Sequence, residues 1–155
     1  MTNAARILDR AGVTYEMATY EVDESDLSAT TAADKLGIPV EQVFKTLVAS
    51  TDQKEIVLAC IPADEELDLK SLGNRAGGKK AELVPIADLQ KLTGYVRGGC
   101  SPLGTRKPYR LFIDETVILH DTISISAGQR GVQLLVNPED LIEVTEATVL
   151  PLVRE

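Results

Sequence analysis

The chain has 155 residues, of which 44% are hydrophobic and 26% charged, and its formal net charge is −8. This size and composition indicate a globular protein with a core large enough to contain a cleft. They exclude a helical membrane span, because no apolar run approaches the ~20 residues needed, and a disulfide framework, because only Cys60 and Cys100 are present.

Apolar spacing and turn residues divide the chain into short helices and strands. In chain order they predict a helix over 4–11, a strand over 13–22, a helix over 28–36, a turn over 40–44, a hairpin of strands 43–48 and 55–61, a helix over 68–76, a strand over 81–84, a helix over 85–92, a loop over 93–104, strands over 110–113, 116–119, 122–126 and 132–136, and a helix opening at Asn137. This order predicts a single α+β domain over 1–155, with a mixed, curved and barrel-like sheet.

Lys45 is the most informative residue, because it interrupts the apolar run from Val43 to Val48. Removing an ammonium group from water is costly unless an anion or several hydrogen-bond partners meet it. With a period of two, Phe44 and Thr46 share one face of the strand, and Lys45 lies on the other. Lys45 is therefore either a solvent-facing gatekeeper of an edge strand or a cation held in a pocket.

The charge is unevenly distributed. Residues 70–110 contain nine basic and two acidic side chains, a net charge of 9 − 2 = +7, which leaves −15 on the remainder. The segment is either an ordinary solvated surface or a positive face that holds a polyanion on an otherwise repulsive body.

Three motif matches fail or stay weak. The stretch from Gly73 to Lys80 resembles a phosphate-binding loop but has a lysine where a hydroxyl should bind Mg²⁺, and 128–131 has the glycine spacing of an RNA-clamping loop but lies between strands. Cys100 with His120 allows a thiol-hydrolase hypothesis, although a cysteine beside glycines is more often a packing residue. Two cysteines and one histidine do not supply a zinc site, so we expect no metal and no cofactor.

The loop from Thr93 to Gly104 is the strongest loop signal. Its adjacent Gly98 and Gly99 allow the backbone to approach a ligand closely, and free N–H groups there suit a carbonyl oxygen or a phosphate. A purely structural loop is the alternative.

Together these segments resemble the YbaK-like family, relatives of the editing domain inserted in bacterial prolyl-tRNA synthetase. The matching stretches occur in the family's order: Thr19-Tyr20-Glu21, 42–48, Asp68-Leu69-Lys70, Gly78-Lys79-Lys80, Thr93-Gly94-Tyr95, Gly98-Gly99, 101–104, Ser126, Gly128 and Arg130-Gly131. Cys100, Ala127 and Gln133 depart from residues frequent in the family, which puts the amino-acid preference in doubt more than the reaction type.

The resemblance implies a cytoplasmic trans-editing deacylase without metal, which removes a mischarged amino acid from the acceptor end of tRNA. Cysteine on tRNA(Pro) is the substrate that the resemblance favours, with the substrate thiol attacking its own ester. Another small amino acid, such as alanine or serine, is an alternative, as is a non-catalytic module that binds tRNA or a synthetase. Prolyl-tRNA synthetase is an implied partner, and no membrane is involved.

The resemblance also assigns roles by position. Lys45 matches the indispensable residue. Tyr20, Thr46, Gly98 and Ser126 match positions that line the family's pocket, and we expect further substrate contacts from Gly99, Ser101 and Gly128. The charge distribution, and not the resemblance, predicts the tRNA contacts, which we expect from Lys79, Lys80, Arg97, Arg106, Lys107 and Arg130.

Overall fold

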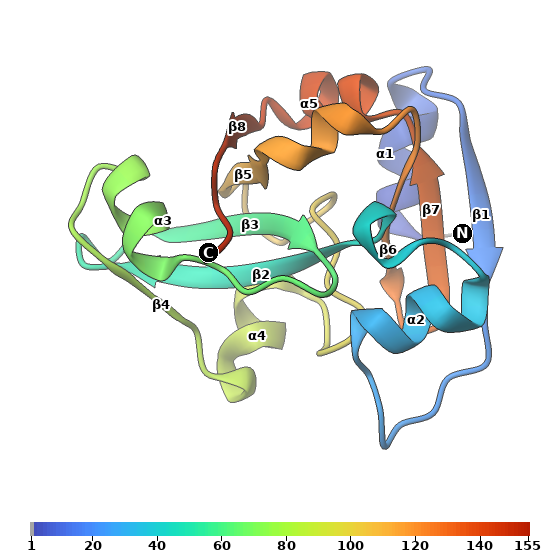
Figure 1. The fold of residues 1–155 in the computed structure, drawn as a ribbon, viewed down its shortest axis with the longest axis horizontal. Helices are drawn as coiled ribbons and strands as arrows, with labels where there is room; N and C mark the ends of the chain where they lie inside the picture. The colour runs from blue at the N-terminus through green and yellow to red at the C-terminus, as the bar shows by residue number, and fades with distance from the viewer. Residues whose placement is uncertain (1) are drawn as a thin grey trace.

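A computed structural model describes residues 2–155 and arranges the strands in two sheets (Figure 1). The three-stranded sheet is antiparallel, in the order β1 (Tyr15–Thr19), β7 (Val132–Val136) and β6 (Ile123–Gln129). The five-stranded sheet has the order β4 (Ala81–Leu83), β2 (Phe44–Thr51), β3 (Ile56–Pro62), β5 (Arg110–Asp114) and β8 (Thr148–Leu150). Its β3–β5 and β5–β8 pairs are parallel, so the expected mixed α+β class is confirmed.

The two sheets do not close into a barrel over the described residues. A single parallel bridge, Val43 with Ser124, joins the start of β2 to β6. Figure 1 shows the strands of the smaller sheet crossing those of the larger one steeply.

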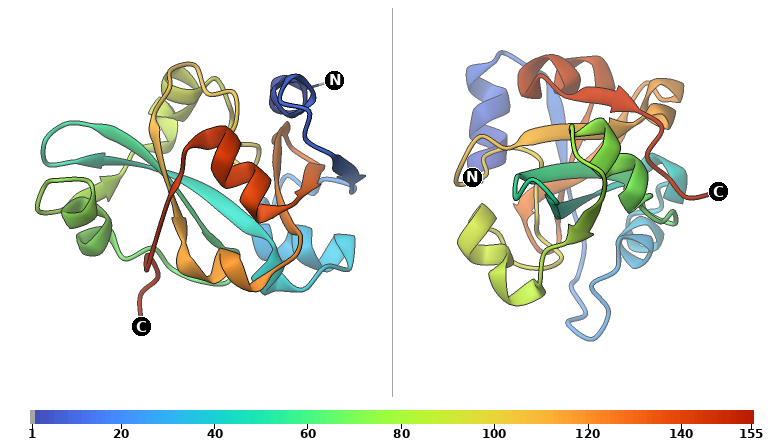
Figure 2. Two further views of the ribbon diagram at one scale, coloured as in Figure 1. Left: turned by 90° about the horizontal axis from the view of Figure 1, so that it is seen from above. Right: turned by 90° about the vertical axis from the view of Figure 1, so that its left-hand side faces the viewer.

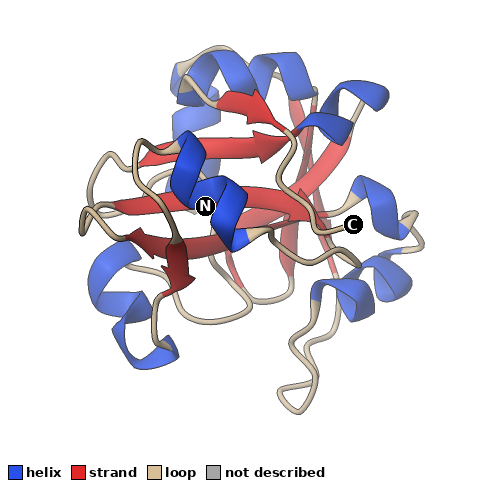
Figure 3. Ribbon diagram, turned by 60° about the vertical axis from the view of Figure 1, so that its left-hand side comes forward, coloured by secondary structure: helices blue, strands red, loops and turns tan. Residues whose placement is uncertain are grey.

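Short helices surround the strands (Figure 3). They are α1 (Asn3–Arg10), α2 (Ala29–Leu36), α3 (Leu69–Arg75), α4 (Ile86–Thr93) and α5 (Pro138–Thr145), with 3-10 helices η1 (Val40–Gln42) and η2 (Glu115–Leu119). Side-chain oxygens of Thr2, Ser28, Asp68 and Asn137 cap four of them by accepting from backbone N–H groups. Within residues 2–155 none of the helices has the length and apolar character needed to cross a bilayer.

Buried apolar side chains form clusters on both faces of the five-stranded sheet. Phe44, Val48 and Leu58 face the smaller sheet and α1, where they meet Ile123 and Leu134. The opposite face carries a second cluster, made by Ala49, Val57, Ile61, Leu72, Phe112 and Leu152. The period-two alternation expected for the Lys45 strand is confirmed, because alternate residues of β2 join different clusters.

The last residues of the chain return to the sheet (Figure 2). The N–H of Asp68 donates to the Leu152 carbonyl at 2.7 Å, and the N–H of Arg154 donates to the Glu66 carbonyl at 2.8 Å. The C-terminal segment thereby holds the loop between β3 and α3.

The strand expected at residues 116–119 was wrong, because this stretch forms η2. Asp114 accepts hydrogen bonds from the N–H and hydroxyl of Thr116, which starts a helical turn in place of an extended chain. Ile118 and Leu119 then remain 71% and 76% exposed. Their apolar character predicted a buried strand face that the structure does not have. Strand β8 was not predicted at all.

We predict that Gly73→Ala destabilises the protein by about 1–3 kcal/mol or more, the usual cost of overpacking. A Cβ atom on Gly73 would overlap the backbone of Lys80, where α3 packs against the chain entering β4. Urea unfolding monitored by circular dichroism measures the change. Asn74→Ala, in the same helix and exposed, is the matched control, and equal stability of the two variants would contradict this packing.

Candidate active site

A cavity of about 540 Å³ lies between the open edge of β2 and the polar face of the smaller sheet. Its remaining walls come from the loop before α2, the β4–α4 connection and the loop around Gly98. Of the residues expected at the site, the cavity is lined by Tyr20, Lys45, Thr46, Arg97, Gly98 and Ser126. Residues distant in sequence thus meet around one space.

The edge of β2 is open because β4 is too short to cover it. Strand β4 pairs only with Ala49–Thr51. On the other side, the Val43 carbonyl accepts from the Ala63 N–H, and the Thr51 N–H donates to the Glu55 carbonyl, so odd-numbered residues of β2 bond to β3. In an antiparallel pair the even-numbered residues then point their backbone groups the other way, and Thr46 presents its N–H and C=O toward the cavity.

Lys45 is partly buried and lines this cavity, so it is not a simple solvent-facing gatekeeper. Burial lowers the pKa of its ammonium group, while the carboxylates of Asp64, Glu66 and Glu65 act in the opposite direction. None of the ion pairs formed within residues 2–155 includes Lys45. Its charge is therefore available to a ligand.

The polar residues beside Lys45 are held in different ways. The Thr46 hydroxyl lies 3.3 Å from the Sγ atom of buried Cys60, and the Ser126 hydroxyl accepts from the Gly128 N–H at 3.1 Å. The Tyr20 N–H donates to the Gly131 carbonyl at 3.0 Å, which fixes its backbone at the end of the smaller sheet. Ser126 keeps its hydroxyl proton for another acceptor.

Gly98 and Gly99 differ in what they offer. Gly98 has a φ of +83°, and a Cβ atom there would lie 3.2 Å from Leu27, so the glycine lets the two cavity loops meet closely. The Gly99 N–H already donates to the Val96 carbonyl at 2.9 Å. Of the two glycines, only Gly98 lines the cavity.

Three other expected substrate contacts lie outside the lining of the cavity: Gly99, Ser101 and Gly128. Ser101 is fully buried, and its hydroxyl accepts from the Leu103 N–H at 3.2 Å. Gly128 has a φ of +96°, and a Cβ atom there would press on the ring of Tyr95 at 2.7 Å. The structure thus gives these residues turn and packing contacts.

The basic residues do not form one patch around the cavity. Arg97 lines it, whereas Lys79 and Lys80 donate their N–H groups to Asp52, at the opposite end of β2. Thr51, next to Asp52, lies roughly 20 Å from Lys45 along an extended strand. Arg106 and Lys107 are exposed in the loop that leads to β5.

Arg130 connects two walls of the cavity. Its Nε donates to the Arg97 carbonyl at 2.8 Å, and its Nη1 lies 3.9 Å from a carboxylate oxygen of Glu24. The β6–β7 turn therefore holds both the loop before α2 and the glycine loop. Contact of Arg130 with tRNA stays a prediction.

Neither cysteine has the character of an activated nucleophile. Burial raises the pKa of Cys100 to about 11 and that of Cys60 to about 12. His120 packs edge-on against Phe44, with ring centroids 6.2 Å apart, and does not line the cavity. Within residues 2–155 no group of three or more His, Cys, Asp or Glu side chains converges as metal ligands do.

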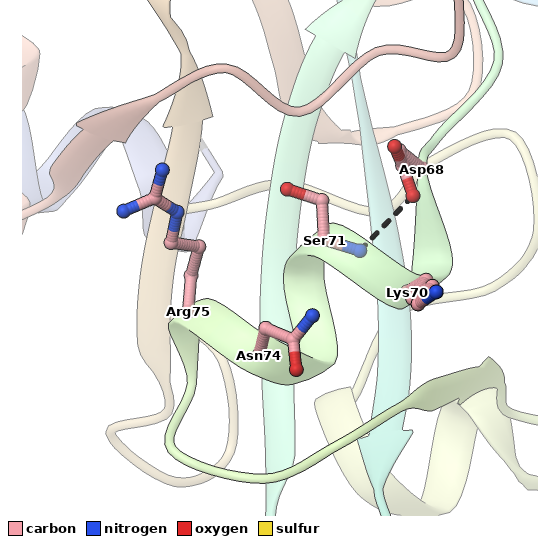
Figure 4. A pocket seen from close by; sticks show the side chains of 5 residues that line it. All are labelled: Asp68, Lys70, Ser71, Asn74 and Arg75. Carbon is pink, nitrogen blue, oxygen red and sulfur yellow. Dashed lines mark hydrogen bonds between the residues drawn. The ribbon is translucent and has the colours of Figure 1, made fainter.

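A second hollow, of about 490 Å³, lies over α3 and shares no residue with the first (Figure 4). Lys70, Asn74 and Arg75 line it, and Asp68 accepts from the Ser71 N–H at 3.0 Å as the helix cap. Because the carboxylate of Asp68 is already engaged by the first turn of α3, we assign the chemistry to the cavity at Lys45.

Several lining residues were missed by the sequence analysis. Leu27, Leu83 and Ile86 add apolar walls, and Asp26 adds a carboxylate whose pKa is lowered by hydrogen bonds from Thr31 and Ser28. Gln133, which the sequence analysis noted as a departure from the family but did not place among the site residues, also lines the cavity. A polar residue in the apolar run 132–136 was a detectable signal for Gln133, of the same kind that singled out Lys45.

A family model described as "Aminoacyl-tRNA editing domain" matches residues 24–144. The chain belongs to this family. The match spans the loop before α2, Lys45, the glycine loop and Gln133, and thus every wall of the cavity except Tyr20.

Two relatives and one solved structure show how close the similarity is. A protein of Enterococcus faecalis, named as a candidate Cys-tRNA(Pro)/Cys-tRNA(Cys) deacylase, is 40% identical over 93% of this chain and 88% of its own. A multifunctional Ser/Thr-tRNA deacylase of Escherichia coli is 26% identical over 90% of this chain and 84% of its own. The crystal structure of a candidate trans-editing enzyme for prolyl-tRNA synthetase matches with a TM-score of 0.81 and 24% identity, over 100% of this chain and 99% of that one, and shows the shared fold.

We predict that Cys100→Ser leaves the activity of the protein within about twofold of the wild type. With a pKa of about 11, only on the order of one thiol in 10⁴ is ionised at neutral pH. Initial rates of cysteinyl-tRNA deacylation, with and without pretreatment by iodoacetamide, measure this. Loss of activity in the variant, or rapid inactivation of the wild type by the reagent, would instead favour the thiol hydrolase.

Proposed function

We propose that this chain is a single-domain, cytoplasmic deacylase that acts in trans to remove cysteine wrongly attached to tRNA(Pro). The observation that carries the proposal is Lys45, a half-buried residue that lines a cavity beside an uncovered strand edge and whose ammonium group has no ion-pair partner within residues 2–155. Membership of the aminoacyl-tRNA editing family and the 40% identical relative support the same reaction class.

The reaction needs little covalent chemistry from the protein. An aminoacyl ester is already activated, so binding and orientation supply much of the rate enhancement. The substrate thiol attacks the ester carbonyl carbon, a C–S bond forms and the C–O bond to the ribose breaks. The thiol proton passes to the ribose oxygen, which releases tRNA with a free hydroxyl and cysteine as a four-membered thiolactone.

Lys45 then stabilises the negative charge that develops on the carbonyl oxygen. Asp64, Glu65 and Glu66 lie close enough to influence the charge of Lys45, and they oppose the approach of a phosphate more than that of a neutral carbonyl. The N–H of Thr46 is a further donor toward the cavity, which Gly98 also lines. Tyr20 and Ser126 hold the ribose and the amino group.

The rim of the cavity suits the end of an RNA strand. Leu83 and Ile86 are 49% and 62% exposed there, which offers apolar surface to the terminal base, and Arg97 offers a guanidinium group to base or phosphate. Prolyl-tRNA synthetase is the proposed partner, because the matched structure is described as a trans-editing enzyme for that synthetase.

Cysteine is the favoured amino acid because the 40% identical relative is named for it, whereas the 26% identical relative is named for serine and threonine. A panel of cysteinyl, alanyl, seryl and prolyl forms of one tRNA separates these substrates. Binding of every form without turnover would support the non-catalytic alternative.

We predict that Lys45→Ala lowers kcat for cysteinyl-tRNA by about 10²–10³-fold, the usual loss when an oxyanion donor is removed. Single-turnover deacylation measures the change, and circular dichroism confirms the fold. Lys54→Ala, an exposed lysine at the far end of the β2–β3 hairpin, is the matched control and should keep full activity. Wild-type rates in Lys45→Ala would refute the role of the ammonium group.

We predict that Arg106→Gln/Lys107→Gln and Lys79→Gln/Lys80→Gln each weaken tRNA binding without changing kcat. Each lost phosphate contact should reduce the slope of log K against log salt concentration by about 0.7–0.9. Filter binding at several salt concentrations measures the slopes. Cysteinyl-adenosine, which lacks the acceptor stem, is the control substrate and should be cleaved equally by all variants. Unchanged slopes in both double variants would show that these residues do not bind tRNA.

A further inference from the structure

Gln133 has a place in the cavity that the proposed reaction has not yet used. It lies on β7 directly opposite Ser126 of β6, so the two side chains share the face of the smaller sheet that lines the cavity. Ser124, two residues before Ser126, lies on the same face. Gln133 is only 7% exposed and Ser124 is fully buried.

The hydroxyl of Ser124 fixes the orientation of the Gln133 carboxamide. It donates to Oε1 of Gln133 at 2.7 Å. A carboxamide has an oxygen that accepts and a nitrogen that donates two protons, so occupation of Oε1 by Ser124 leaves Nε2 on the other side. Ser124 thereby determines which end of the amide can meet a ligand.

The Nε2 atom of Gln133 is open to the cavity. It makes no hydrogen bond within residues 2–155. In the same range, every fully buried side-chain nitrogen or oxygen atom has a hydrogen-bond partner, so Nε2 must be accessible. Because Gln133 lines the cavity, the accessible side of Nε2 is the cavity side. A buried donor of this kind destabilises the folded protein unless water or a ligand accepts a hydrogen bond from it.

We propose that Gln133 binds the aminoacylated ribose by donating from Nε2 to a neutral oxygen, either the ester carbonyl or a ribose hydroxyl. The inference rests on the proposed function and adds a specificity-determining contact to it. A group that only donates disfavours an ammonium ion at this point, so the amino group of the substrate lies elsewhere in the cavity.

Three variants test the polarity of this contact. Gln133→Met keeps the size but loses the donor, and we expect kcat/KM to fall about tenfold at neutral pH. Gln133→Glu should lose at least as much, because a carboxylate accepts only. Its activity relative to wild type should rise as the pH falls and the carboxyl gains a proton to donate. Ser124→Ala, which frees the amide to rotate, should lower kcat/KM by less than Gln133→Met does. In the double variant Ser124→Ala/Gln133→Met, kcat/KM should be no lower than in Gln133→Met alone.

A binding measurement keeps the test independent of turnover. Calorimetry with an unreactive amide analogue of cysteinyl-adenosine should show about tenfold weaker binding to Gln133→Met. If the 2′-deoxy form of the analogue shows the same ratio of dissociation constants between Gln133→Met and wild type, the acceptor is the carbonyl. If the ratio disappears, the acceptor is the ribose hydroxyl.

Two results would overturn the inference: full activity and binding in Gln133→Met, or full activity of Gln133→Glu at neutral pH, which would mean that the residue accepts from an ammonium group. Failure of the proposed function is distinct, because then wild-type protein itself would release no amino acid from any charged tRNA in the panel.

Discussion

The site depends on the incomplete coverage of β2. A strand whose edge is uncovered carries free N–H and C=O groups, and proteins usually block such edges because they invite pairing with other chains. Here β4 covers only Ala49–Thr51, and the smaller sheet contacts β2 at the Val43–Ser124 bridge. The stretch between these two points faces a cavity, and Lys45 stands in that stretch.

The walls around this edge are tied together by contacts outside the cavity. Arg130 joins the Arg97 carbonyl to Glu24, Leu27 packs on Gly98, and Ser124 orients Gln133. An exposed ion pair adds little to stability, but the hydrogen bond to a loop carbonyl sets where that loop lies. The polar groups of the cavity are thus held in position before any substrate binds, which is the condition for electrostatic stabilisation of a transition state.

Local sequence signals predicted much of the fold. The β2–β3 hairpin, the caps at Ser28 and Asn137, and the strand over 132–136 follow from alternation, capping chemistry and turn residues, which act over a few positions. Strand β8 could not be found in this way, because Thr148–Leu150 pairs in parallel with β5, more than thirty residues away. The apolar residues of η2 suggested a strand because the hydrogen bonds of Asp114 to Thr116 were not considered.

The site was predictable where a residue conflicts with its surroundings. Lys45 stood out for this reason, and Gln133 carried the same signal. The burial of Ser101, the use of the Gly99 N–H inside its own turn, and the distance from Lys45 to Lys79 and Lys80 depend on how loops fold back in space, which residue spacing does not encode. The central claim is that an unpaired, partly desolvated Lys45 meets the substrate. Side-chain NMR of ¹⁵N-lysine protein, assigned with Lys45→Arg, tests it most directly. The pKa of Lys45 should lie below the ordinary 10.5 in the free protein and move when an unreactive cysteinyl-adenosine analogue binds, whereas an ordinary pKa that the analogue leaves unchanged would contradict the account.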